Sequence, residues 1–248
     1  MHVVRVAVCS DIHSNIEAFD AVLARAGEEG AEAVWILGDI VGYGADPVAV
    51  VDRVRSLPAA VVLGGNHDLA ATDRFDVRWF NRIAARAIEW TKTVLDDTTR
   101  EFLTALQPAG SKGGVILVHG SVVDPAIEYV TNERVAEESF AAASFACCFF
   151  GHTHLPTIFT AVADGSVRGA VLGEGESVEL RGDRRYMVNP GSVGQPRDGD
   201  ARASFAMYDT AANRVVLHRV AYDVDAAAGK IRGAGLPDTL ADRLAVGR

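Results

Sequence analysis

The stretch VWILGDI, residues 34–40, is an apolar run followed by a glycine, a carboxylate and an isoleucine. A short apolar run of this kind is typical of a strand that is buried on both faces of a sheet. Asp39 stands where that strand should end. Because ligands collect outside the carboxyl ends of the strands in open α/β sheets, we expect the Asp39 carboxylate to face a binding crevice.

Four other apolar runs end at side chains that can bind a metal ion. They are residues 3–10 before Asp11 and His13, residues 59–65 before Asn66, His67 and Asp68, residues 114–118 before His119, and residues 146–151 before His152 and His154. A single histidine after a strand is more often a structural residue, but five of the seven histidines lie at these strand ends. We therefore expect these side chains to converge on one rim, and we interpret His2 and His218 as structural.

The order of helical and strand patterns predicts an α/β fold. Residues 15–27 have the apolar spacing of an amphipathic helix, and Asp46-Pro47 opens a second helix that Pro58 ends. Strands that alternate with helices predict a parallel sheet with right-handed crossovers. Further helices are expected within residues 69–95, from a capping box at Thr98 and Glu101 up to Pro108, and at residues 132–140.

Beyond Gly151 the pattern changes to short strands separated by turns. The strands lie around residues 157–161, 167–171, 178–180, 185–188, 204–208 and 214–220. They predict a second, largely antiparallel sheet packed face to face on the first, which gives a sandwich with helices outside. No linker divides the chain, so we expect one domain over residues 1–248 with a short helical tail from about residue 223.

Composition limits the classes of partner. The chain has 24 Lys and Arg against 33 Asp and Glu, a formal net charge of −9, which argues against a broad nucleic-acid-binding surface. Bound divalent metals would supply the positive charge that a phosphate substrate needs. Cys9, Cys147 and Cys148 lie in apolar runs without C-x-x-C spacing, so we expect reduced core residues and a cytoplasmic location. We find neither a signal peptide nor a run that suits a membrane span.

The residue types at the strand ends indicate which metals bind. Imidazole, carboxylate and one amide without a thiolate favour manganese, iron, zinc or nickel over calcium or a sulfur-bound zinc. Eight such groups are too many for one ion. Two ions would share a bridging carboxylate, a role that suits Asp39. Together they would stabilise the attacking and the leaving oxygens of an in-line phosphoryl displacement. Asn66 is either a turn residue or a ligand, and its position between Gly65 and His67 favours a ligand.

These motifs resemble those of the calcineurin-like metallophosphoesterases. The matching elements are D-x-H at Asp11 and His13, G-D at Gly38 and Asp39, G-N-H-D at residues 65–68, the lone His119, and G-H-T-H at residues 151–154. A later segment, NPGSVGQPRDGD at residues 189–200, is similar to a loop of the small bacterial phosphodiesterase branch. The resemblance implies a four-layer αββα sandwich, with two mixed β-sheets packed face to face and helices outside.

The resemblance also implies a role for each motif residue. The first ion would be bound by Asp11, His13, Asp39 and His154, and the second by Asp39, Asn66, His119 and His152. His67 would orient the substrate phosphate and protonate the leaving oxygen, and Asp68 would fix the tautomer of His67. Metal-bound hydroxide would attack in a single step, with manganese as the first choice of metal.

We therefore predict a hydrolase, a dinuclear metal-dependent phosphoesterase that acts on a small phosphoester or nucleotide-like substrate. A phosphodiester is favoured because no arginine among the motifs meets the extra charge of a phosphomonoester, although Arg74, Arg78 and Arg197 stay open as such a clamp. The alternatives are a phosphomonoesterase, including a protein or nucleotide phosphatase, and a non-catalytic binding scaffold of the same fold. A nuclease is disfavoured because the chain has no added capping domain, and a homo-oligomer is left open.

Overall fold

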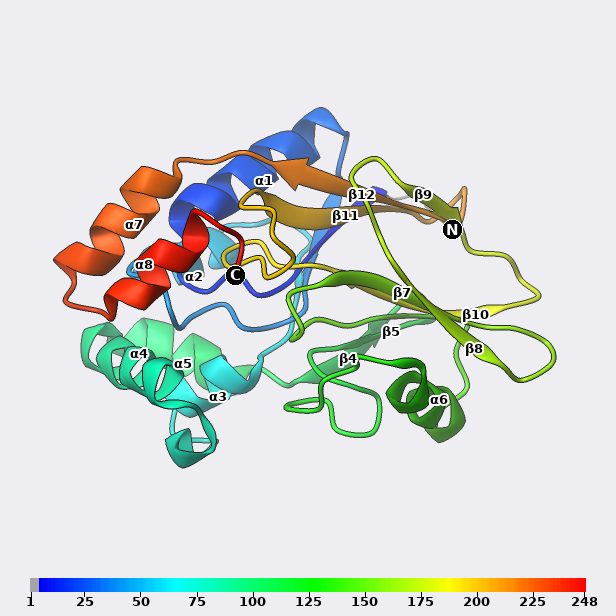
Figure 1. The fold of residues 1–248 in the computed structure, drawn as a ribbon, viewed down its shortest axis with the longest axis horizontal. Coiled ribbons are helices and arrows are strands. Elements are labelled where there is room, and N and C mark those ends of the chain that lie inside the picture. The colour runs from blue at the N-terminus through cyan, green and yellow to red at the C-terminus, as the bar shows by residue number, and fades with distance from the viewer. Residues whose placement is uncertain (1–4) are drawn as a thin grey trace.

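Two six-stranded β-sheets lie face to face in the structure, a computed structural model that describes residues 5–248 (Figure 1). The first sheet has the strand order β3-β2-β1-β11-β12-β9 and the second the order β4-β5-β6-β10-β7-β8. The strands of the first sheet are β1 (Arg5–Cys9), β2 (Ala33–Ile36), β3 (Val61–Val62), β9 (Ser177–Glu179), β11 (Ala203–Asp209) and β12 (Arg214–Val220). Those of the second are β4 (Ala109–Lys112), β5 (Val115–Val118), β6 (Cys147–Phe149), β7 (Pro156–Ala161), β8 (Val167–Val171) and β10 (Arg185–Pro190). His2 and the start of the strand predicted at residues 3–10 lie outside the described residues.

Alternating side chains on the central strands bury both faces of each sheet. On β1, Val6 and Val8 pack between the sheets with Phe149 of β6, whereas Ala7 and Cys9 belong to the apolar cluster beneath helix α1 (Ile16–Glu28). Helix α6 (Glu133–Ala142) covers the outer face of the second sheet. Because both faces are apolar, these strands read as continuous apolar runs. The predicted four-layer αββα sandwich of two mixed sheets is confirmed.

The later strands are divided between the two sheets. β9, β11 and β12 join β1, β2 and β3 in the first sheet, and β7, β8 and β10 join β5 and β6 in the second. The prediction that the later strands form the second sheet by themselves is wrong, because pairing depends on contacts between distant segments that no local pattern records. The exposed edge strand β4 has no sequence signal either, since its residues, AGSK, show no apolar alternation.

Parallel pairing brings the loops with the predicted ligands to one end of the sandwich. β1 pairs in parallel with β2, and β2 with β3, while β6 pairs in parallel with both β5 and β10. The expected rim is formed, but by two sheets rather than one. The loops after β1, β2 and β3 come from the first sheet, and those after β5 and β6 come from the second.

Most of the predicted helices are present, and one has a corrected start. Besides α1 and α6 they are α2 (Pro47–Arg55), α4 (Arg82–Val94), α5 (Asp97–Ala105), α7 (Val224–Gly233) and α8 (Asp238–Leu244). The short helix α3 (Asn66–Ala71) and the 3₁₀ helix η1 (Val77–Trp79) were not predicted. Helix α5 is capped by Asp96, which accepts a hydrogen bond from the amide of Thr99 at 2.7 Å. The capping box predicted at Thr98 and Glu101 is therefore wrong, because Asp and Thr are both good caps and the local sequence does not choose between them.

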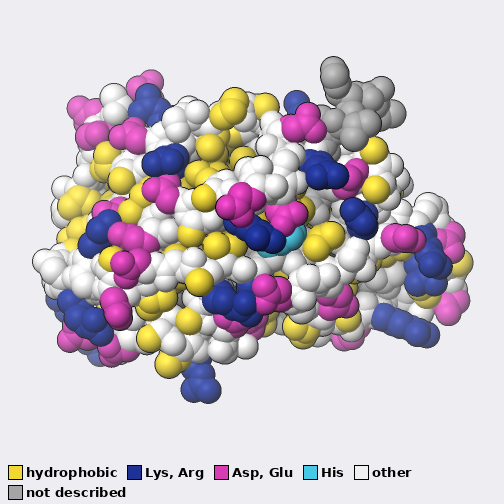
Figure 2. All heavy atoms as spheres, turned by 90° about the horizontal axis from the view of Figure 1, so that it is seen from above, with side chains coloured by type: hydrophobic (Ala, Val, Ile, Leu, Met, Phe, Trp, Pro, Cys, Tyr) yellow, Lys and Arg dark blue, Asp and Glu magenta, His cyan; other side chains and the backbone are white. Residues whose placement is uncertain are grey.

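The tail helices α7 and α8 pack with α4 at one end of the sheets, where α7 is orange and α8 red in Figure 1. On the face shown in Figure 2, Lys and Arg side chains are mixed with Asp and Glu side chains, and no broad basic surface is seen. Within residues 5–248, no helix combines the length and the apolar character needed to cross a membrane.

Candidate active site

The structure brings all the predicted site residues together in the loops at this end of the sandwich. They are Asp11, His13, Asp39, Asn66, His67, Asp68, His119, His152 and His154, and none is more than 7 % exposed. His218 lies apart from them and stacks on Phe205, with ring centres 5.1 Å apart. Because these nine polar side chains are buried, they need hydrogen-bond or metal partners, either among themselves or from a bound ligand.

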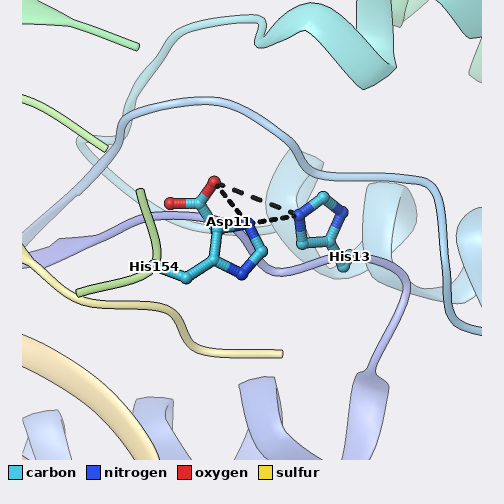
Figure 3. A group of neighbouring side chains, drawn as sticks. All are labelled: Asp11, His13 and His154. Carbon is cyan, nitrogen blue, oxygen red and sulfur yellow. Dashed lines mark hydrogen bonds and ion pairs between the residues drawn. The ribbon is translucent and has the colours of Figure 1, made fainter. Parts of the chain in front are cut away.

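The first group of side chains contains Asp11, His13 and His154 (Figure 3). Nε2 of His13 lies 3.1 Å from Nε2 of His154, which lies 3.3 Å from Oδ1 of Asp11. Each ring uses Nδ1 for a backbone carbonyl, His13 at 3.2 Å from Val41 O and His154 at 2.6 Å from Gln195 O. A carbonyl oxygen can only accept a hydrogen bond, so in the neutral rings both Nδ1 atoms carry the proton and both Nε2 atoms are unprotonated.

Two unprotonated nitrogens as close as Nε2 of His13 and Nε2 of His154 repel each other unless a cation lies between them. Ligands about 2.1 Å from one ion lie about 3 Å apart, which is the separation of the two Nε2 atoms. Oδ1 of Asp11 is buried and has no hydrogen-bond partner among residues 5–248. The donor set therefore fits a metal ion.

The second group has the same design. Nε2 of His119 lies 3.1 Å from Nδ1 of His152, 3.1 Å from Oδ1 of Asn66 and 3.4 Å from Oδ2 of Asp39. The other nitrogen of each ring is 3.0 Å (His119) or 3.1 Å (His152) from a backbone carbonyl oxygen, so in the neutral form of each ring the nitrogens facing each other are again unprotonated and able to bind a metal. Metal-binding histidines commonly have this arrangement, because the outer hydrogen bond fixes the tautomer and the ring orientation.

Asp39 lies between the two groups. Its Oδ2 is 3.4 Å from Nε2 of His119 in the second group and 3.6 Å from Nε2 of His13 in the first. Its Oδ1 accepts a hydrogen bond from the backbone amide of His67 at 2.9 Å. A carboxylate in this position can be shared between two ions.

The electrostatics of the two groups differ. Burial lowers the pKa values of His13 and His154 well below the usual range and that of His152 to about 3, so these rings stay neutral, as metal ligation requires. Burial alone would also lower the pKa of His119, but the Asp39 carboxylate raises it to about 9. In the absence of a cation, a proton on His119 therefore balances the charge of Asp39.

The backbone at the site is strained. The φ angles of Asp11 (54°), His13 (49°), Asp39 (52°), His152 (66°) and His154 (60°) are all positive. This left-handed conformation costs about 1–3 kcal/mol at a residue other than glycine and is found where the surrounding structure imposes it. Five of the seven predicted metal ligands are held in this way, and their ligand atoms lie close together in the two groups.

The loop of residues 189–195 imposes part of this geometry. Ser192 Oγ donates to the carbonyl of Asp11 at 2.8 Å, and the amide of Gly194 donates to the same oxygen at 3.0 Å. The side-chain amide of Asn189 donates to the carbonyl of Gly151 at 2.7 Å. A Cβ atom on Gly194 would lie 1.8 Å from the carbonyl oxygen of Ile12, so only glycine fits there. The segment noted in the sequence for its resemblance thus fastens together the loops after β1 and β6.

Asp68 does not contact the ring of His67, contrary to the role expected for it. Its carboxylate accepts hydrogen bonds from the backbone amides of Gly65 (2.8 Å), Val41 (2.9 Å) and Ile40 (3.2 Å). Nδ1 of His67 is buried without a hydrogen-bond partner in the described part of the chain. The expected tautomer contact is wrong, because the carboxylate is occupied by the amide of Gly65 and by two amides from the loop after β2, which the motif does not include. Asp68 instead ties that loop to the start of α3.

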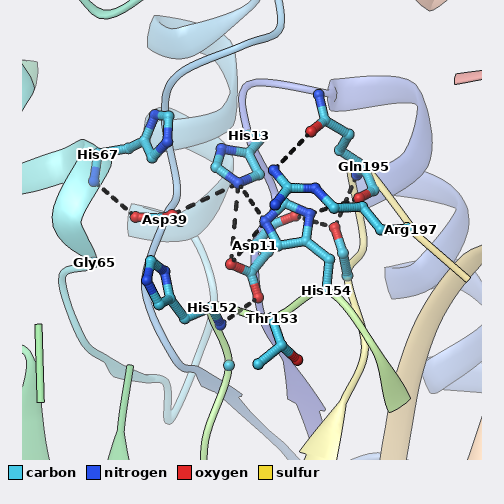
Figure 4. A network of polar contacts seen from close by, with 12 residues as sticks. Asp11, His13, Asp39, Gly65, His67, His152, Thr153, His154, Gln195 and Arg197 are labelled. Atoms are coloured by element: carbon cyan, nitrogen blue, oxygen red, sulfur yellow. Dashed lines mark hydrogen bonds and ion pairs between the residues drawn. The ribbon is translucent and has the colours of Figure 1, made fainter. Parts of the chain in front are cut away.

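One arginine lies beside the metal-ligand groups (Figure 4). Nη2 of Arg197 donates to Oε1 of Gln195 at 3.0 Å and lies 3.4 Å from the hydroxyl of Tyr43. Its Nε is buried and has no partner among residues 5–248. After burial, the positive charge of Arg197 is the largest cause of the lowered pKa of His154. Arg197 therefore brings a cation with an unused donor to the site.

The other two candidate arginines are engaged elsewhere. Arg74 donates to the backbone carbonyls of Thr104 (2.9 Å) and Leu106 (2.6 Å), and Arg78 pairs with Asp76. Arg197 is the only one of the three that lies in the segment of residues 189–200 noted for its resemblance, but that segment does not show by itself that the side chain lies beside the metal-ligand groups. The partners that hold it, Tyr43 and Gln195, are distant from each other in the sequence, and sequence reasoning gave neither of them a contact with a site residue.

An αββα sandwich that presents buried histidine and aspartate clusters at the ends of its strands has the fold and the site of a metallophosphoesterase. The model of the calcineurin-like phosphoesterase superfamily domain matches residues 4–213, and the chain belongs to this superfamily of hydrolases. An uncharacterised protein of Methanocaldococcus jannaschii is 39% identical over 248 residues, which cover 98% of both chains.

Two solved structures share the fold of this chain, and the first also supports the assignment. The crystal structure of a metallophosphoesterase from Sphaerobacter thermophilus is similar over 100% of both chains, with a TM-score of 0.89 and 39% sequence identity. That of a hypothetical protein from Pyrococcus horikoshii OT3 has a TM-score of 0.80 over 98% of both chains at 22% identity, which shows the fold alone.

Proposed function

We propose that this phosphoesterase binds two divalent metal ions and hydrolyses a small phosphoester. Asp11, His13, Asp39 and His154 would hold the first ion, and Asp39, Asn66, His119 and His152 the second. The observation that carries this proposal is the orientation of the four histidines in these sets. Each donates a hydrogen bond from one ring nitrogen to a backbone carbonyl and directs the other nitrogen, which is unprotonated when the ring is neutral, toward the other ligands. Manganese is our first choice, with iron, zinc or nickel as alternatives.

When bound, the two ions would neutralise phosphate charge and acidify a water molecule for in-line attack. Asp39, between the two groups, would set the spacing of the ions. Asp68 would position Asp39 and His67 through the backbone amides that it binds.

His67 is proposed as the proton donor to the leaving oxygen. Burial lowers its pKa to about 4, so the ring is neutral in the free protein. A phosphate bound beside it would raise that pKa through its negative charge, and the ring would then carry the proton that the leaving oxygen takes. His67 also lies within ligand distance of His13 and Asp39, so the number of ions bound by a His67 variant tests this role.

Arg197 bears on the class of ester. The sequence argument for a phosphodiester assumed that no arginine meets the extra charge of a monoester, and the position of Arg197 beside the metal-ligand groups, with an unused Nε, argues against that premise. We propose that its unused Nε binds a terminal phosphate oxygen and that a phosphomonoester is the preferred substrate, with a phosphodiester as the second candidate. We further propose that residues 1–248 act as one domain in a reducing, cytoplasmic compartment, since the three cysteines are buried and unpaired.

The test is to strip the purified protein with a chelator, reload it with each candidate metal and desalt it. We expect about two ions per chain and metal-dependent hydrolysis of 4-nitrophenyl phosphate at a higher specificity constant than bis(4-nitrophenyl) phosphate. A protein that retains no metal and turns over neither ester would refute the phosphoesterase proposal and favour the binding scaffold.

A further inference from the structure

A pocket of about 310 Å³ opens beside the metal-ligand groups on the side of His67. Its inner wall includes Asn66, His67 and His152. Its other walls are mostly aromatic and come from distant segments: Tyr43 from the loop after β2, Phe75, Trp79 and Phe80 from the segment between α3 and α4, and Tyr129 from the loop after β5. Small-molecule sites range upward from about 300 Å³, so this pocket suits one compact group rather than a polymer.

Two of the rings are exposed to solvent at the pocket. Trp79 is 78% exposed and Tyr129 is 49% exposed, although large aromatic side chains usually bury most of their surface. The indole of Trp79 contacts no other aromatic ring in the part of the chain that the structure describes. Tyr129 is held flat against His152, with ring centres 3.8 Å apart and an interplanar angle of 25°. The pocket thus offers exposed aromatic faces next to proposed metal ligands.

The chemistry of the lining restricts the occupant. Among the described residues, no Lys, Arg, Asp or Glu lines the pocket, so it does not suit a second phosphate or another charged group. The side chains of Asn66 and Asn81 and the hydroxyls of Tyr43 and Tyr129 add polar groups to the rings. A planar heterocycle satisfies both features, because its faces stack and its edge forms hydrogen bonds, whereas an alkyl chain leaves the polar groups unused.

We propose that this pocket binds the leaving group of the phosphoester and that the leaving group carries a nucleobase, which stacks on Trp79 and Tyr129. The inference rests on the proposed function, since that function brings the phosphate to the metal ligands. His67 packs edge-on against Phe80 of the pocket, with ring centres 4.9 Å apart. His67 thus lies between the phosphate and the base, on the side where the leaving oxygen departs.

The experiment compares two esters with the same leaving alkoxide. Adenosine 5′-phosphate and methyl β-ribofuranoside 5-phosphate differ only in the base. We expect a specificity constant about ten- to a hundredfold higher for the adenosine ester, which is the range that stacking of one base provides. The same pair is also measured as methyl diesters, with chromatography of the products to show that the ribose alkoxide is the group released, so that a preference for monoesters or diesters does not decide the result.

Variants of η1 assign the effect to the pocket. Trp79→Ala should reduce the ratio of the two specificity constants about tenfold and leave the base-free ester unchanged, and Trp79→Phe should retain most of the ratio. Arg78→Ala is the matched control, because Arg78 is the neighbouring residue, its side chain is 87% exposed and it does not line the pocket. Equal specificity constants for the two esters, or a ratio that Trp79→Ala leaves unchanged, would overturn the inference.

A separate measurement distinguishes this failure from failure of the proposed function. If no phosphoester is hydrolysed with any metal, the proposed function fails, and binding of adenosine 5′-phosphate is then titrated calorimetrically. Weaker binding to Trp79→Ala than to the unmutated protein supports the pocket. Equal binding overturns it.

Discussion

Removing the Asp68 carboxylate should destabilise the fold more than it damages the chemistry directly. This carboxylate accepts three backbone hydrogen bonds at 2.8–3.2 Å and is 0% exposed. Burial and the charge of Asp39 raise the pKa of Asp68 to about 7, so the comparison is made above that pH, where the carboxylate is charged. Hydrogen bonds to a charged group contribute about 1.5–3 kcal/mol each, and a buried amide without an acceptor costs about 1–3 kcal/mol. The longest bond is weaker and water can enter the space that is left, so we expect Asp68→Ala to lower the free energy of unfolding by about 3–5 kcal/mol.

Asp68→Asn should cost less, about 2 kcal/mol, because its one carbonyl oxygen retains some of the bonds while its amide group faces a backbone donor. Urea unfolding of the metal-free protein is the assay, since chelation removes any loss of stability that comes from weaker metal binding. Asp96→Ala is the matched control, because Asp96 is also a capping carboxylate but an exposed one, and its removal should have a much smaller effect.

The opposite pattern would refute this reasoning. If Asp68→Ala unfolds at the same urea concentration as the unmutated protein and still loses turnover, then Asp68 acts in the chemistry, as the sequence predicted, and not through the backbone. An intermediate case is also informative. If turnover falls only when the denaturation midpoint falls, the effect on catalysis follows from the displaced loop after β2.

Three further predictions concern the site. Asp39→Asn should lower metal content from two ions per chain to one or none and remove activity in parallel, as measured by elemental analysis beside a turnover assay; full metal content with lost activity would contradict the shared-ligand role. His67→Asn should retain both ions and lose about a hundred- to ten-thousandfold in rate on an unactivated alkyl ester but less on 4-nitrophenyl phosphate, since nitrophenolate leaves without a proton; an equal loss on both esters, or the loss of an ion, would exclude the acid role. Arg197→Met should lower the specificity constant for 4-nitrophenyl phosphate about ten- to a hundredfold and change that for the bis ester little, because the lost interaction is with the extra charge; an equal loss on both would show that Arg197 binds neither ester selectively.

The site could be predicted from the sequence to the extent that its signals are local. A carboxylate or an imidazole that follows an apolar run is recognisable within ten residues, and such runs led to Asp39, His119 and His152. The αββα sandwich could be anticipated for a similar reason, since strands with two apolar faces need a covering layer on each.

What the sequence could not predict depends on contacts between distant segments. The pairing of β11 with β1 joins residues about two hundred positions apart, and no pattern within either strand records it. Of the three arginines considered as clamps, Arg197 lies in the quoted segment of residues 189–200, but its place beside the metal-ligand groups follows only from its packing with Tyr43 and Gln195. Asp68 was given the wrong partner because the amides that it binds belong to a loop whose course is set by the sheet.

The same distinction applies to the individual ring nitrogens. Motifs name the histidines, but the carbonyls that orient them are 25 (His152), 28 (His13), 41 (His154) and 82 (His119) residues away in the chain. His13, His119 and His154 turn Nε2 toward the other ligands, whereas His152 turns Nδ1, because its Nε2 faces the carbonyl of Ile127. That carbonyl lies in the loop that also carries Tyr129, which stacks on the same ring. The loop after β5 therefore orients a proposed metal ligand and forms a wall of the base pocket, so a change in this loop that alters substrate choice should also alter affinity for the second ion.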